Sequence, residues 1–191
     1  MIQKSYSRIA TIINRSAPAG TVLGIVSIAC MFINQLCATL CETSPFLGNL
    51  LSFVVWLAKF IGCIWLMKFF MKRFAAREEE VNNKDTFLFG LFAALLSSLL
   101  FAALTMLNMA VISPELYQAQ YDMALQAVAP MLDSNTMAKM SSIMENIHEI
   151  AFFQTFIYCF LYGIILSAIL SRNIPARDPF AQFKNNEENA E

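Results

Sequence analysis

Lys59 stands near the middle of a long apolar stretch, residues 46–71, and no apolar stretch of the chain contains an acid that could neutralise it. A charged side chain near the centre of a bilayer costs about 2.5 to 3.5 kcal/mol on insertion scales, so such residues usually face a bundle interior or an aqueous cavity. Two interpretations stay open. Either the amine is neutral or snorkels toward the cytoplasmic surface, with snorkelling favoured on sequence alone, or Lys59 contacts an anion such as a lipid phosphate.

The cysteines and the lone histidine are the other residues that could do chemistry. Cys30, Cys37 and Cys41 share one helical face, a pattern that could gather a soft metal. Glu145 and His148 form one Glu-x-x-His unit, which di-iron bundles use in pairs. The chain offers no second such unit, no CxxC pair and an odd number of cysteines, five. We therefore predict no catalytic residue, no metal site and no cofactor, and hence no enzyme.

Composition indicates what kind of fold must position these residues. The chain has 191 residues, of which 58% are hydrophobic and 14% charged, whereas soluble domains are roughly half apolar and about a quarter charged. This excludes an ordinary soluble globular protein. The net charge of -1 provides no field that would recruit nucleic acid, so we predict the lipid bilayer, and not nucleic acid, as the surrounding partner.

Four apolar runs are long enough to cross a bilayer, which takes roughly 20 helical residues. Only four residues separate the first two runs, so these must form an antiparallel hairpin. We predict an all-α, polytopic membrane protein whose four-helix transmembrane domain covers residues 17–171. The predicted spans are 17–41, 46–71, 87–112 and 151–170.

The basic residues predict the orientation in the membrane, because Lys and Arg resist translocation. Eleven of the thirteen lie before the first span, around the second link or after the fourth span. We therefore predict that both termini are cytoplasmic. Residues 1–16 have an apolar and a basic face, which predicts an amphipathic helix on the cytoplasmic leaflet. The polar tail, residues 172–191, is predicted to be disordered.

Residues 113–150 are too polar to enter lipid and carry helical apolar stripes, which predicts an extracytoplasmic amphipathic helical hairpin. Ser113-Pro114-Glu115 is a helix start, and Pro130 ends that helix near Val128. A second helix begins at Asp133 or Ser134. The apolar stripes of the two helices could pack on each other over the span ends, which we favour on general grounds, on the outer leaflet, or on a membrane or periplasmic protein partner. The candidate partner surface comprises Tyr117, Tyr121, Met137, Met140 and Met144.

Gly20 and Gly24 are spaced for close helix contact near the start of the first span. The spacing fits packing inside the chain and equally fits contact between copies in a homo-oligomer, so both stay open.

The chain resembles a known family in the tight first hairpin, the basic link, Ser113-Pro114-Glu115-Leu116-Tyr117 and the closing segment Tyr162-Gly163-Ile164-Ile165-Leu166-Ser167-Ala168-Ile169-Leu170-Ser171-Arg172. It is similar to the small bacterial proteins of domain of unknown function 4199, over roughly residues 15–172. The resemblance implies four spans and the bacterial inner membrane. It implies no established activity and no site residues.

From these patterns we predict an uncharacterised, non-enzymatic accessory or assembly component that acts through its extracytoplasmic helices. The alternative is a small transporter or channel for an anionic solute or lipid, with Lys59 as its intramembrane charge. The direction of one side chain separates the two: a transporter requires Lys59 to face a polar cavity within the bundle.

Overall fold

The computed structural model describes residues 2–40, 45–78, 81–128, 130, 133, 136, 139 and 146–174. Within them the fold is all-α, as predicted. A π-helical turn, η1 (Asn108–Ile112), joins the third helix to the fourth. The helices are α1 (Ile2–Leu40), α2 (Pro45–Arg77), α3 (Asn83–Leu107), α4 (Pro114–Val128) and α6 (Ile147–Ser171).

Four of these helices are long and apolar enough to cross a membrane, which confirms the four predicted runs. Each helix begins before the run that predicts it, and α2 and α6 also end after it, because polar residues continue the helical hydrogen bonding outside the hydrocarbon length. Helix α3 ends at Leu107, and η1 completes its predicted run to Ile112. In particular, α1 continues without a break from the predicted surface helix into the first span, with Pro18 inside it. Most of the predicted tail, residues 175–191, lies outside the described residues.

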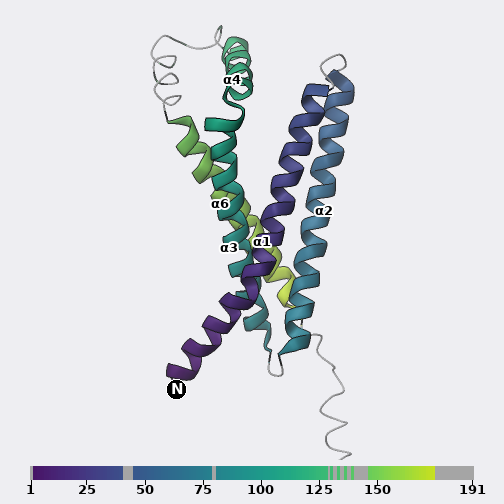
Figure 1. Ribbon diagram of the computed structural model, residues 1–191, viewed down its shortest axis with the longest axis vertical. Coiled ribbons are helices and arrows are strands. Elements are labelled where there is room, and N and C mark those ends of the chain that lie inside the picture. The colour runs from purple at the N-terminus through teal and green to yellow at the C-terminus, as the bar shows by residue number, and fades with distance from the viewer. Residues whose placement is uncertain are drawn as a thin grey trace, which may run out of the picture.

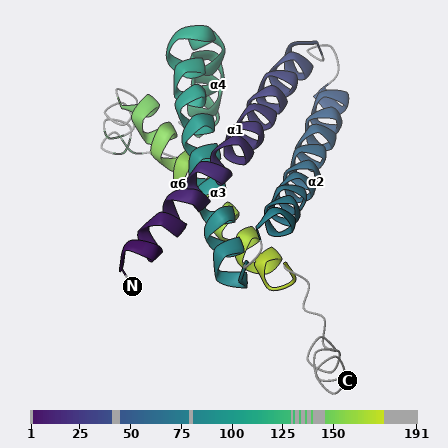
Figure 2. The same ribbon diagram turned by 60° about the horizontal axis from the view of Figure 1, so that its bottom comes forward.

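Helix α3 is the centre of the bundle. It packs extensively on α1 and on α6, whereas α2 packs mainly on α1 and touches α3 and α6 little. Figure 1 shows α1 and α2 running side by side as the predicted hairpin, with α6 crossing α3. The view in Figure 2 shows the same two helix pairs, α1 with α2 and α3 with α6. The bundle therefore has two tight seams on α3 and a loosely attached α2.

Small residues make the tight seam between α1 and α3 possible. A Cβ placed on Gly20 would lie 2.7 Å from the Ala93 carbonyl oxygen, and one on Gly24 would lie 3.2 Å from Leu100. The face of Gly20 and Gly24 is therefore occupied by α3 of the same chain. Close backbone approach of this kind stabilises helix association through van der Waals packing. The hydrophobic effect contributes little between helices that lipid already surrounds.

Two ion pairs join the N-terminal half of α1 to Glu78, just after α2, and to Asp85, in the first turn of α3. The Arg8 guanidinium lies 2.6 Å from the Asp85 carboxylate, and Arg15 lies 3.3 Å from Glu78. The backbone amide of Asn82 also donates to the Asp85 carboxylate, at 3.0 Å, so this acid both caps α3 and holds α1. The basic face of residues 1–16 is thus partly engaged by protein, and its contact with the leaflet stays a prediction.

At the opposite end, α4 begins at Pro114 and ends at Val128, as Ser113-Pro114-Glu115 and Pro130 predict. Asp133 accepts a 3.1 Å hydrogen bond from the Thr136 amide, the interaction of a helix N-cap. Hydrogen bonds from the Thr136 side chain and backbone lower the pKa of the Asp133 carboxyl. Three predicted contact residues of the second helix lie outside the described residues: Met137, Met140 and Met144.

Candidate functional site

A cavity of about 140 Å³ lies between α1, α2, α3 and α6, and Lys59 is one of the residues that line it. We call it the Lys59 cavity. Most of its lining is apolar or aromatic, as in ligand sites where a few polar groups fix orientation. Its polar lining residues are Ser27, Lys59, Ser97, Ser98, Tyr158 and Tyr162, with Cys63 and Cys159 beside them.

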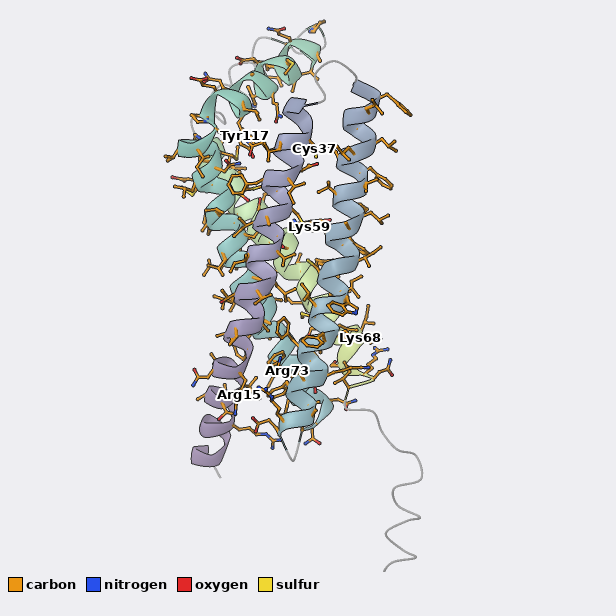
Figure 3. All side chains as sticks on the ribbon, turned by 45° about the vertical axis from the view of Figure 1, so that its right-hand side comes forward. Arg15, Cys37, Lys59, Lys68, Arg73 and Tyr117 are labelled. Carbon is orange, nitrogen blue, oxygen red and sulfur yellow. The ribbon has the colours of Figure 1, made fainter. Side chains whose placement is uncertain are left out.

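The Lys59 side chain crosses the bundle interior toward α3. Its Nζ lies 4.0 Å from the centroid of the Phe101 ring, and Figure 3 shows Lys59 about midway along α2, well above Lys68 and Arg73. The amine is therefore not drawn down to the basic end of the bundle. This geometry differs from the snorkelled lysine that we favour on sequence alone, because α3 offers an aromatic face within reach of the ammonium.

The Phe101 ring compensates only part of the cost of burying the Lys59 charge. A cation–π contact contributes about 0.5–1 kcal/mol, rising to about 2 kcal/mol when desolvated, against about 2.5 to 3.5 kcal/mol for a lysine at the bilayer centre. The ion pairs formed within the described part of the chain, Arg8–Asp85 and Arg15–Glu78, do not include Lys59. An anion in the cavity would supply the remaining stabilisation.

A second polar group in the cavity lacks a partner. The Tyr162 hydroxyl is buried and has no hydrogen-bond partner among the described residues, and a buried hydroxyl left unpaired costs roughly 1–3 kcal/mol. Two of the neighbouring hydroxyls are engaged: Ser98 donates to the Leu95 carbonyl at 2.9 Å, and Ser27 lies 3.9 Å from the Cys63 sulfur. Lys59 and Tyr162 thus present two donors to one small space.

Sequence reasoning identified Lys59 but missed Tyr162 as a cavity residue. A weak signal exists, because Tyr158 and Tyr162 are spaced four residues apart and so share a helix face. That spacing alone does not indicate which neighbour the face meets. Packing of α6 on α3 turns Gly163 toward Ala94 and brings the adjacent Tyr162 to the cavity.

The structure describes some of the residues considered for metal chemistry: Cys30, Cys37 and His148. The described residues contain no group of three or more His, Cys, Asp or Glu side chains that could hold a metal ion. Cys37 lies near the end of α1 and His148 in the first turn of α6. Cys41 and Glu145 lie outside the described residues.

A separate polar cluster lies near the end of the bundle that carries α4. The buried Asn108 side chain donates to the Gln35 side-chain oxygen at 3.2 Å and to the Tyr117 hydroxyl at 3.0 Å. Its own oxygen has no partner among the described residues. Tyr117, which the sequence places on a partner surface, thus turns its hydroxyl toward Asn108, and Figure 3 shows it beside the upper part of α1. Tyr121, one turn further, is half-buried.

Comparison with known proteins identifies the family to which the chain belongs. A family model described as a protein of unknown function, DUF4199, matches residues 19–172, which covers all four apolar helices in whole or in large part. No curated protein and no solved structure matches the chain.

Proposed function

The chain belongs to the DUF4199 family, and we propose that this member is a small transporter for an anionic solute or lipid, with Lys59 as the residue that recognises the anion. One observation carries the proposal: Lys59 lines a cavity inside the bundle instead of reaching the basic end, and this cavity is polar only in part, with hydroxyl groups set into a mainly apolar and aromatic lining. A charge kept at this depth is costly, and in membrane proteins such charges mark substrate paths.

The arrangement of donors supports an anion and not a cation. Lys59 supplies an ammonium, and Tyr162 supplies a hydroxyl without a partner among the described residues. No acid lies within any of the four predicted spans, so the membrane-embedded part of the chain holds no carboxylate to attract a cation. An acceptor with negative charge would engage both donors and neutralise the ammonium.

The proposed setting is the bacterial inner membrane, with both termini in the cytoplasm. The basic residues near the lower end of the bundle support this orientation, because positively charged segments stay on the cytoplasmic side. Arg8, Arg15 and Lys84 belong to this set. In this orientation α4 lies outside the cytoplasm.

Equilibrium binding tests the proposal with the purified full chain in phosphatidylcholine vesicles. The probes are radiolabelled inorganic phosphate, acetate and dodecanoate, and the variant is Lys59→Met, with the exposed Lys68→Met as matched control. A hydrogen bond to a charged group contributes about 1.5–3 kcal/mol, so Lys59→Met should weaken binding of the preferred probe about ten- to a hundred-fold. Equal affinities in the three proteins, or no binding of any probe, would overturn the proposal.

Efflux distinguishes a transporter from a protein that only binds its ligand. Vesicles loaded with the preferred probe should release it faster when they contain wild-type protein or Lys68→Met than when they contain Lys59→Met. Binding that depends on Lys59 without any effect on efflux would limit the function to binding.

The exposed helix α4 favours a second candidate function, that of an accessory component for a membrane or periplasmic protein. Helix α4 buries none of its residues, and Met123 is 63% exposed. A photo-crosslinking residue placed at Met123 should capture one defined protein in intact cells if this function holds. Recovery of lipid adducts alone would count against it.

A further inference from the structure

The Lys59 cavity opens sideways, between α2 and α6. Three of its lining residues are exposed, and all three belong to these two helices: Trp56 and Phe60 from α2 and Tyr158 from α6. Trp56 is 53% and Tyr158 71% exposed. The lining residues from α1 and α3 are buried or half-buried. Since α2 and α6 make few contacts with each other, the opening lies at a loosely packed seam of the bundle.

The surface around this opening is apolar. Phe53 on α2 and Ile157 and Leu161 on α6 are exposed beside the rim, and both helices belong to the candidate membrane spans. A helix face of this composition is solvated by lipid chains. The opening therefore faces the hydrocarbon of the bilayer, so a ligand can enter from the lipid phase.

The size of the cavity restricts what it can hold. An engineered cavity of about 150 Å³ in a soluble protein binds benzene, so the Lys59 cavity, at about 140 Å³, has room for a small head group and a few carbons. The rest of an amphiphile would leave through the opening between Trp56 and Tyr158.

The two donors indicate the head group. The single ammonium of Lys59 balances one negative charge, and the Tyr162 hydroxyl, which has no partner among the described residues, can donate to a second oxygen of the same group. A carboxylate has this charge and this number of oxygens, whereas a phosphate monoester carries close to two charges at neutral pH.

We propose that the Lys59 cavity binds the carboxylate of a single-chain fatty acid, which enters from the lipid phase between Trp56 and Tyr158 with its chain left in that opening. The inference rests on the proposed function and adds to it the class of ligand and the route of entry.

Photo-labelling with a fatty acid that carries a diazirine on its chain tests the proposal in vesicles that contain the full chain. The label should attach to residues of α2 and α6 that flank the opening. Competition with unlabelled twelve-carbon amphiphiles keeps the chain constant and varies the head. Dodecanoate should displace the label at least ten-fold better than dodecyl phosphate, and dodecyl trimethylammonium should not displace it.

Variants test separately the head-group contact at Lys59 and the opening at Trp56. Lys59→Met should reduce labelling at least ten-fold, and Lys59→Arg should retain most of it because the charge is kept. Trp56→Ala should change the labelling pattern on α2, whereas Trp65→Ala, at an exposed tryptophan that does not line the cavity, should leave it unchanged.

The outcomes separate this inference from the proposed function. One outcome would overturn the fatty-acid proposal but still support an anion site: phosphate or acetate binding depends on Lys59, while labelling by the diazirine fatty acid is the same in wild type and Lys59→Met. Labelling spread evenly over the lipid-facing surface would overturn the lateral route. Binding of no anion that depends on Lys59 would overturn both.

Discussion

Ala94 of α3 lies directly against Gly163 of α6, so close that a Cβ built on Gly163 would overlap the Cβ of Ala94. The same seam brings Gly90 against Ser167, whose hydroxyl donates a 2.8 Å hydrogen bond to the Phe87 carbonyl. Gly163 and Ala94 also line the Lys59 cavity. The contact that joins these two helices therefore also forms one wall of the candidate binding site.

Gly163→Ala should destabilise the bundle. The added methyl group must displace α6 from Ala94, and overpacking of this kind costs about 1–3 kcal/mol. Gly62→Ala is the matched control, since a Cβ at Gly62 meets nothing within 4 Å and alanine favours a helix over glycine by about 1 kcal/mol. Thermal unfolding in detergent should give a lower midpoint for Gly163→Ala and an equal or higher one for Gly62→Ala. Equal midpoints in both variants and wild type would show that α6 can move away from Ala94 without loss of stability.

Tyr117→Phe should loosen α4. The change removes the hydrogen bond between Asn108 and the Tyr117 hydroxyl, an interaction of about 0.6 kcal/mol on average between membrane helices. Hydrogen exchange of the α4 amides should accelerate about two- to three-fold, while exchange in α3 stays unchanged. Tyr121→Phe is the control on the same helix. Identical exchange in wild type and Tyr117→Phe would mean that Asn108 does not hold α4.

The pair between Arg8 and Asp85 should contribute weakly and depend on salt. Their side chains are 47% and 13% exposed, and exposed ion pairs typically contribute 0.2–1 kcal/mol. A double-mutant cycle with Arg8→Gln and Asp85→Asn should give a coupling energy in about that range. The coupling should shrink at about 1 M salt, where the screening length falls to about 3 Å. A coupling that is insensitive to salt would contradict a solvent-accessible pair.

Lys59→Met should stabilise the protein when no anion is bound. The substitution removes a charge that costs about 2.5 to 3.5 kcal/mol near the bilayer centre and gives up a cation–π contact of about 1 kcal/mol. The thermal midpoint of protein stripped of lipid should therefore rise relative to wild type. A fall in the midpoint of stripped Lys59→Met would indicate that the ammonium is fully compensated within the bundle, which leaves no energetic reason for an anion.

Cysteine labelling should establish the orientation. Met123→Cys on α4 should react with a membrane-impermeant maleimide added to intact spheroplasts, and Lys84→Cys in the basic link should react only after lysis. The four native cysteines that the structure describes lie inside the spans and are half-buried, so a protein without the added cysteine sets the background. The reverse pattern would place the termini outside the cytoplasm.

Several features of this protein follow from sequence because they depend on length and local chemistry. Apolar runs of bilayer length must become helices, since lipid offers no partner for backbone groups. Four residues between the first two runs force a hairpin. Ser113-Pro114-Glu115 starts α4 and Pro130 follows its end, because capping and proline geometry act within one helical turn.

Only the tertiary structure decides which side of each helix faces its neighbours. In a soluble protein the polar face marks the outside, but lipid and protein interior are both apolar, so the sequence of α2 does not show where Lys59 points. Helix α3 settles that direction by placing Phe101 opposite Lys59. The packing of Gly163 on Ala94 likewise brings Tyr162 to the same cavity. Lys59 and Tyr162 line one cavity because the four helices pack around a space that no single helix encodes.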